Sequence, residues 1–194
     1  MKLGIVVGST RPNRVSLKEA KWIAKTAKEL DGVEPEIVDL KDYPMPFFDE
    51  PASPRYNPDR KIEPAVQKWL DKINQFDAYI FVTAEYNHSI PAVLKNAIDY
   101  ITTELNRKPA TVVSHGSVGG ARATMHLKEI LSESRAAIIP QAVTFIGVSD
   151  AVDEEGNLNE DIKANPYGPY GALQIALVEL KWYSDALSVA RSKD

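Results

Sequence analysis

Short β-branched runs alternate with longer stretches whose apolar residues recur three and four positions apart along the whole chain. The short runs are typical of strands, and the longer stretches are typical of helices that bury one face. The run from Ala78 to Thr83 is almost entirely apolar, as a strand buried on both faces of a sheet must be. The alternation therefore predicts an α/β fold in which helices cover both faces of a parallel sheet.

Five strands and five helices are expected from this alternation. The strands are expected at residues 3–7, 36–38, 78–83, 110–113 and about 142–148. The helices are expected to begin at Ser16, near Ile62, at Pro91, after the Gly119–Gly120 pair and near Leu173. Right-handed crossovers between parallel strands build a doubly wound five-stranded sheet, for which we expect the flavodoxin-like order 2-1-3-4-5.

Two of these helices have signals for their ends. The first helix starts with Ser-Leu-Lys-Glu, so Ser16 and Glu19 fit a capping box, and Asp31–Gly32 is a stop signal. The helix from Pro91 keeps its apolar spacing as far as Leu105. We therefore expect it to extend to that residue.

The composition is that of a globular protein without cysteine. Its 194 residues are 44% hydrophobic, which suits one domain over 1–194. A net charge of -4 leaves no basic surface, so neither a nucleic acid nor a membrane is expected as a partner. The lack of cysteine excludes disulfides, thiolate metal sites and a cysteine nucleophile. The apolar run 3–8 is too short for a signal segment, so we expect a cytoplasmic protein.

Two segments interrupt the alternation. Residues 43–58 hold five of the 13 prolines and the adjacent Phe47 and Phe48, which predicts a stiff loop. This loop either folds onto its own domain or forms a wall of the site or a subunit contact, and the sequence favours neither. Residues 150–161 are acidic, but Gly156 has the wrong spacing for a calcium loop, so we expect a solvated turn.

The loop after the first strand, residues 8–15, carries hydroxyls, two arginines and the free N–H groups of a helix start. Ligands of doubly wound folds bind at the carboxyl ends of the strands, where this loop lies. The combination predicts a phosphate site with Ser9 and Arg11 as its leading candidates. Ser16 is either a phosphate ligand or only a helix cap. The glycine spacing fits neither a dinucleotide fingerprint nor a P-loop.

Two further loops are expected at the same edge of the sheet. After the third strand, Tyr86 either contacts a flat ligand or packs on the next helix, and Asn87 either contacts the ligand or caps that helix. After the fourth strand, three glycines let the backbone approach a ring, and the following helix would offer its N-terminus to negative charge. His88 and His115 lack the spacing of a zinc motif and are interpreted as ordinary loop histidines.

Three motifs in these loops resemble the NADPH-dependent FMN reductase family of flavodoxin-like proteins, which includes quinone, azo-dye and chromate reductases. The motifs are GSTR followed by Ser16, EYNHSIPAVLKNAIDY at residues 85–100 and GSVGGARATMHL at residues 116–127. Their order and intervals match the family over most of the chain. Two positions depart from the family pattern, because Ala84 stands where proline is usual and Ala92 where glycine is usual.

The resemblance implies an FMN site built from all three loops. The first loop would hold the phosphate and the other two would hold the ring. By this resemblance Ser9, Arg11, the Val15 backbone and Ser16 contact the phosphate, Glu85, Tyr86 and Asn87 line the ring beside Ala84, and Ser114 and Gly116 approach its pyrimidine edge.

The resemblance also implies an enzyme that takes hydride from NADPH or NADH onto FMN and passes electrons to small acceptors such as quinones, azo compounds, free flavin or metal oxyanions. Because the flavin carries the reaction, no general acid or base is expected from the chain. Alternating use of one ring face predicts ping-pong kinetics, and the family implies a homodimer or homotetramer. Two alternatives stay open: an FMN-binding electron carrier with little NAD(P)H turnover, and a dinucleotide-binding domain in which Asp39 holds a ribose.

Overall fold

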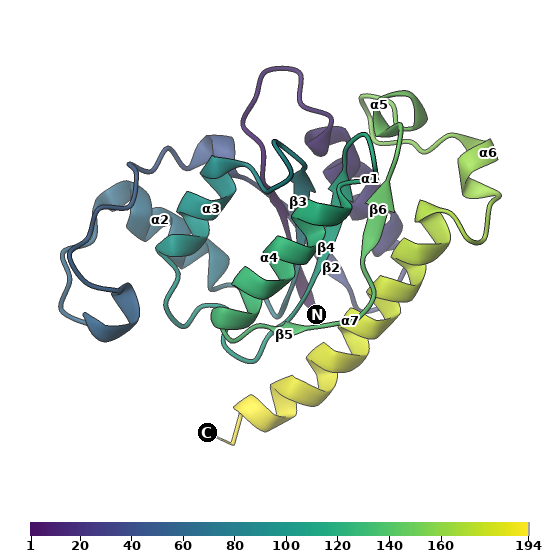
Figure 1. The fold of residues 1–194 in the computed structure, drawn as a ribbon. Helices are drawn as coiled ribbons and strands as arrows, with labels where there is room; N and C mark the ends of the chain where they lie inside the picture. Colours follow the sequence, from purple (N-terminus) through teal and green to yellow (C-terminus); the bar gives the residue numbers. More distant parts are fainter. Residues whose placement is uncertain (194) are drawn as a thin grey trace.

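The computed structural model describes residues 1–193 and contains one six-stranded parallel sheet with helices on both faces (Figure 1). The strand order is β2-β1-β3-β4-β5, and β6 also pairs with β4. The strands are β1 (Lys2–Val7), β2 (Glu34–Asp39), β3 (Ala78–Ala84), β4 (Pro109–His115), β5 (Ala137–Ile138) and β6 (Val143–Phe145). The predicted doubly wound fold and its order 2-1-3-4-5 are confirmed.

The fifth strand differs from its prediction at 142–148. It is split into β5 and β6, which pair with successive parts of β4, and Val148 already belongs to the next helix. Pro140 lies between the two pieces and has no N–H to donate to a strand ladder. The Thr111 hydroxyl donates to the Gln141 carbonyl instead and holds the interruption against β4.

The helices divide into two layers, one on each face of the sheet. α2, α3 and α4 pack with Tyr79 and Phe81 on one face, and α1 and α7 pack with Ile80 and Val82 on the other. Every residue of β3 is buried, as predicted. The helices are α1 (Ser16–Lys28), α2 (Pro64–Ile73), α3 (Ala92–Asp99), α4 (Ala121–Glu133), α5 (Val148–Ala151), α6 (Glu160–Lys163) and α7 (Pro169–Arg191), with 3-10 turns η1 (Leu40–Asp42) and η2 (Pro54–Tyr56).

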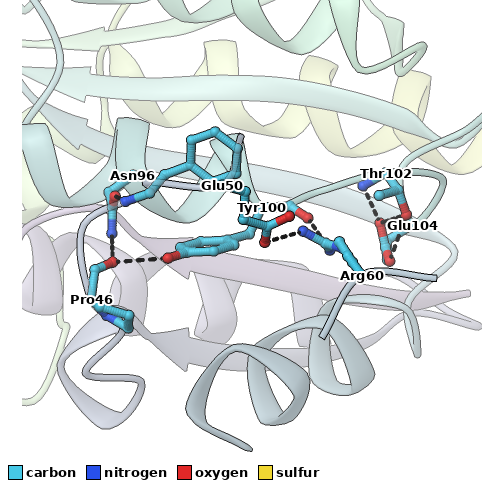
Figure 2. Close-up of polar contacts among 8 residues, drawn as sticks. Pro46, Glu50, Arg60, Asn96, Tyr100, Thr102 and Glu104 are labelled. Carbon is cyan, nitrogen blue, oxygen red and sulfur yellow. Dashed lines mark hydrogen bonds and ion pairs between the residues drawn. The ribbon is translucent and has the colours of Figure 1, made fainter. Parts of the chain in front are cut away.

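The third helix is shorter than predicted, because α3 ends at Asp99 and not near Leu105. Beyond it, the Glu104 carboxylate accepts a hydrogen bond from the Thr102 N–H at 2.7 Å (Figure 2). It also accepts one from the Thr103 N–H at 2.9 Å. Ile101 and Leu105 remain buried in the turn that follows. These two buried apolar residues keep the helical spacing beyond Asp99, and the predicted helix was therefore too long.

The proline-rich loop at 43–58 folds onto α3 and the turn after it (Figure 2). The Asn96 side chain accepts from the Phe48 N–H at 2.8 Å and donates to the Pro46 carbonyl at 2.7 Å. Arg60 pairs with Glu50 at 2.7 Å and donates to the Tyr100 carbonyl at 3.0 Å. The loop is therefore part of its own fold, although Phe47 remains 79% exposed.

The acidic segment at 150–161 combines the end of α5, the start of α6 and a turn between them. The Asp153 carboxylate accepts hydrogen bonds from the Glu155 and Asn157 N–H groups at 3.0 and 2.7 Å, which makes the expected turn. The turn is only partly solvated, because Gly156 is buried against the backbone of Lys21 and Trp22. Within residues 1–193, no helix has both the length and the apolarity needed to cross a bilayer.

Candidate functional site

The loops that follow β1, β3 and β4 meet at the top of Figure 1. Residues of all three loops line a cavity of about 250 Å³. Their convergence follows from the parallel sheet, in which all strands end at the same edge. Six predicted residues line the cavity. They are Arg11, Val15, Ala84, Glu85, Tyr86 and Gly116. Arg14 and His115 line it as well, and sequence reasoning assigned neither of them to a ligand.

A larger cavity of about 440 Å³ lies between residues 54–74 and 102–104, at the opposite end of the sheet. Ligands of this topology bind beyond the carboxyl ends of the strands, and the larger cavity lies where β3 and β4 begin. The charged side chains that line the larger cavity already have partners in the protein. The Arg60 guanidinium is paired with Glu50, and the Glu104 carboxylate accepts hydrogen bonds from two backbone N–H groups. The smaller cavity is therefore the candidate site.

Ser9 and Tyr86 join the first two loops. The Ser9 hydroxyl lies 2.8 Å from the Tyr86 hydroxyl, and Ser9 is buried. The guanidinium carbon of Arg11 lies 5.2 Å from the centre of the Tyr86 ring, which is within the range of a cation–π contact. Tyr86 is thus held against the predicted phosphate loop and is not packed only against the following helix.

The start of α1 does not form the predicted capping box. Val15 occupies the cap position and no side chain caps the helix. Glu19 is fully buried and turns toward β4, where its carboxylate lies 2.7 Å from Nδ1 of His115. The Ser16 hydroxyl is fully buried and has no hydrogen-bond partner among residues 1–193. The first N–H groups of any helix also lack partners within the helix, so this turn has spare donors.

Arg14 belongs to the site through an ion pair that the sequence did not reveal. Its guanidinium pairs with the Asp39 carboxylate, and it also donates to the Arg11 carbonyl at 3.5 Å. The other oxygen of Asp39 accepts from the Lys41 N–H at 3.0 Å. Both oxygens of Asp39 are therefore engaged within the chain, and the alternative in which Asp39 holds a ribose is not supported.

Glu85 connects the second loop to the start of α4. Its carboxylate accepts from Nε of Arg122 at 2.7 Å and from the backbone N–H groups of Arg122 and Ala123 at 3.1 and 3.4 Å. The hydrogen bond from the Arg122 side chain is the main reason that the pKa of Glu85 lies below its ordinary value. The N-terminus of α4 was expected to face negative charge on a ligand, but Glu85 already occupies it.

Asn87 and His88 form the tip of the second loop. Both have left-handed backbone angles, with φ of 49° and 68°, inside a tight turn closed by two hydrogen bonds between Tyr86 and Ser89. Asn87 is exposed, and α3 begins after Pro91 with no side-chain cap. Asn87 is therefore not the cap of that helix, and its side chain is accessible beside the cavity.

Ser114 lies beneath the third loop and not in the cavity. Its hydroxyl donates to the Gly119 carbonyl at 2.8 Å and accepts from the Thr124 hydroxyl at 2.7 Å. Gly120 has φ of 76°, and a Cβ there would lie 2.8 Å from the Ser114 Cβ, so this turn requires glycine. Ser114 is fully buried and does not line the cavity, whereas Gly116 lines it directly.

His115 is not the ordinary loop histidine that the sequence suggested. It is the last residue of β4, it is buried, and its ring is hydrogen-bonded to Glu19. His88 is exposed and does not share a partner with it. Across the described chain no group of three or more histidine, aspartate or glutamate side chains is arranged to hold a metal ion.

Comparison with known proteins decides the family of this chain. A family model described as NADPH-dependent FMN reductase matches residues 1–150. The chain belongs to this family. The resemblance of the three motifs is thereby confirmed over most of the sequence.

Relatives of the family differ in the acceptor that their names give. The chain is 34% identical to an NAD(P)H-dependent FMN reductase of Schizosaccharomyces pombe over 72% of this chain and 70% of the relative. It is 32% identical to an NAD(P)H-dependent FMN reductase of Saccharomyces cerevisiae, over 84% of this chain and 93% of the relative. It is 30% identical to a quinone reductase of Pseudomonas putida, over 85% of this chain and 87% of the relative. The solved structure of a flavoenzyme NAD(P)H:(acceptor) oxidoreductase of Paracoccus denitrificans has the same fold, with a TM-score of 0.69 and 23% identity. The match covers 96% of this chain and 97% of that one.

Replacing Glu85 with glutamine is expected to lower the free energy of unfolding by about 1 kcal/mol at pH 7, because Arg122 is partly exposed and solvent screens the pair. The folded-state pKa of Glu85 is lowered from its ordinary value of 4.5. Its stabilising contribution is therefore complete above about pH 4.5 and is lost as the pH falls through the lowered pKa.

Urea unfolding of wild type and Glu85→Gln between pH 7 and pH 3 measures the free energy of unfolding and tests this prediction. The difference between wild type and Glu85→Gln is expected to shrink in acid, while the exposed-site control Glu34→Gln stays within about 0.5 kcal/mol of wild type throughout. A difference that is constant down to pH 3 would contradict the role given to the Glu85 charge.

Proposed function

We propose that this protein is an FMN-dependent NAD(P)H oxidoreductase that reduces small oxidised acceptors such as quinones. Its membership in the NADPH-dependent FMN reductase family supports this function. So do the relatives whose names give NAD(P)H-dependent FMN reductase and quinone reductase activities. The observation in the structure that carries the proposal is the buried Ser16 hydroxyl at the first residue of α1, which has no partner in the part of the chain that the structure describes.

The residues of the first loop fit a phosphate. Phosphate oxygens accept hydrogen bonds and offset the positive end of a helix dipole, so a free hydroxyl and free N–H groups at a helix start suit them. Ser16 and the backbone at Val15 supply these groups, and Ser9 and Arg11 lie in the loop above them. A single terminal phosphate satisfies this set without the glycines that a pyrophosphate requires.

The second and third loops fit a flat ring. Tyr86 is fixed by Ser9 and Arg11, and Ala84, Glu85 and Asn87 flank it along the same loop. Gly116 brings backbone into the cavity beside Glu85, where a Cβ would lie 3.2 Å from the Glu85 Cβ. Ser114 lies behind the third loop, where its buried hydroxyl holds the Gly119 carbonyl and so supports the loop from inside the protein.

FMN supplies the redox chemistry when it is bound, because it takes a hydride from NAD(P)H and gives electrons to the acceptor. The chain's own residues bind the phosphate, orient the ring and leave one face open to both substrates in turn. Glu85 stays ionised and holds the second loop to α4, so the loop that lines the ring is fixed before a ligand arrives. Successive use of one face by two substrates gives ping-pong kinetics.

The purified protein is expected to show an oxidised-flavin absorbance spectrum that bleaches on anaerobic addition of NADPH or NADH and returns when a quinone is added. Initial rates with both substrates varied are expected to give parallel double-reciprocal lines. A flavin spectrum that persists after NAD(P)H would favour the electron-carrier alternative. Lines that intersect would contradict alternating use of one face.

Replacing Arg11 with alanine is expected to weaken FMN binding by about tenfold or more, because a charge-assisted hydrogen bond to the phosphate is lost. Flavin content after dialysis and the dissociation constant for FMN measure this effect. Arg55→Ala removes the same charge at the opposite end of the sheet and is the matched control. Retention equal to wild type would remove Arg11 from the site.

We infer a homodimer or homotetramer in the cytoplasm, where NAD(P)H is available. Exposed apolar side chains support the assembly: Phe47 lies on a loop that is anchored to its own fold, and α7 exposes Ile175, Val178 and Trp182 on successive turns. A second copy would cover these residues. Light scattering is expected to give at least twice the mass of the chain, and a monomer at micromolar concentration would contradict the assembly.

A further inference from the structure

Glu19 is a charged side chain in the interior whose role the proposed function does not explain. It is fully buried between α1 and β4, and its Oε1 has no hydrogen-bond partner within residues 1–193. Its Oε2 lies 2.7 Å from Nδ1 of His115. A buried carboxylate is costly unless it is paired and hydrogen-bonded. This pair is therefore unlike the exposed ion pairs of the chain, such as Lys181 with Asp185.

The pair also sets which nitrogen of His115 is available to the cavity. An ionised carboxylate only accepts hydrogen bonds, so Nδ1 of His115 carries a proton and donates it to Glu19. Nε2 makes no hydrogen bond in the described part of the chain, although His115 lines the cavity and 10% of its side chain is exposed. A histidine fixed in this way accepts a hydrogen bond at Nε2 when neutral and donates one when protonated.

The site needs a positive group of this kind. A hydride carries two electrons and one proton, so its arrival leaves one extra negative charge beside the loops. The N-terminus of α4 does not offset this charge, because the Glu85 carboxylate already occupies it. His115 is the one histidine among the residues that line the cavity, and an imidazole ring carries no charge or one positive charge according to whether one or both of its nitrogens hold a proton.

Building on the proposed function, we propose that His115 faces bound FMN through Nε2 and takes up a proton from water when electrons enter the site, with Glu19 as the positioning residue behind it. NAD(P)H loses a hydride and becomes NAD(P)⁺, and the site gains one negative charge. An N–H bond forms at Nε2, and the imidazole becomes an imidazolium whose charge is balanced on one side by Glu19. The proton returns to water when the electrons leave for the acceptor.

Other charged groups near His115 come from each element around it. Glu19 is on α1, and Arg11 and Arg14 reach the cavity from the first loop. On the second loop, the Glu85 N–H donates to the His115 carbonyl, Tyr86 lines the cavity, and the Glu85 charge is paired with Arg122 of α4. The neighbouring residue on β6 is the apolar Phe145. Arg14 is neutralised by Asp39, so Glu19 is the unbalanced negative charge in contact with His115.

The test compares oxidised and reduced FMN in the holoprotein. The ratio of their dissociation constants is obtained from the midpoint potential of bound FMN, measured by dye equilibration between pH 5.5 and 8.5. His115→Gln is expected to retain oxidised FMN but to bind reduced FMN about tenfold more weakly relative to wild type, the size expected for one hydrogen bond to a charged group. One break in the pH dependence of the potential is expected to disappear.

Glu19→Gln and a matched control complete the experiment. Nitrogen-15 NMR of the histidine rings is expected to show a protonated Nδ1 in wild-type His115 over the whole pH range and a change of tautomer population in Glu19→Gln. His126→Gln removes an exposed histidine on α4 and is expected to change neither result. If His115→Gln fails to fold, the double variant with Glu19→Gln lets two amides pair and replaces it.

The outcomes separate the two proposals. A protein that binds FMN and is reduced by NAD(P)H, but whose His115→Gln variant keeps the wild-type ratio and pH profile, would overturn the role of His115 and leave the proposed function standing. An unprotonated Nδ1 in wild type would overturn the role of Glu19. A wild-type protein that binds no FMN would overturn the proposed function itself, and the role of His115 with it.

Discussion

The complete burial of β3 and β4 is the constraint on which the rest of this structure depends. Every residue of both strands is buried, so every backbone polar group along them must pair within the sheet. The chain can then change direction only beyond the strand ends, and a parallel sheet brings those ends to one edge. The loops beyond this edge carry the polar side chains and the free N–H groups of a helix start that line the candidate site. The candidate site is a consequence of how the sheet is buried.

Within the site, the groups that are paired differ in role from those that are not. Some polar groups already have partners inside the protein and so fix the loops with respect to one another. They are the carboxylate of Glu85, the guanidinium of Arg14 and the hydroxyl of Ser114. Among the described residues 1–193, the buried Ser16 hydroxyl has no partner and neither has one ring nitrogen of His115. Loops fixed in advance cost less to order when a ligand binds, and the unpartnered groups are those that a ligand can satisfy.

The sequence predicted the strand order and the three converging loops because both follow from local periodicity. It was wrong where a distant partner decided the outcome. Ser16 and Glu19 have the spacing of a capping box, but His115, 96 residues further along the chain, pairs with Glu19. Arg14 was one of two loop arginines, and only the structure shows Asp39 of the next strand pairing with it.

The predicted ends of α3 and of the last strand were wrong because local spacing does not show where a helix or strand stops. Ile101 and Leu105 keep the helical spacing of α3 although the Glu104 carboxylate ends the helix by binding the next N–H groups. Pro140 divides the last strand within a segment whose flanks are both apolar. Six of the site residues taken from the family motifs line one cavity, and their contact with a ligand stays a prediction.

A crystal structure of the protein with FMN shows which cavity holds the cofactor. The phosphate is expected at the start of α1, within hydrogen-bond distance of the Ser9 and Ser16 hydroxyls, and the ring between Tyr86 and Gly116. FMN bound instead in the larger cavity beside Arg55 and Glu104, at the amino ends of β3 and β4, would contradict it.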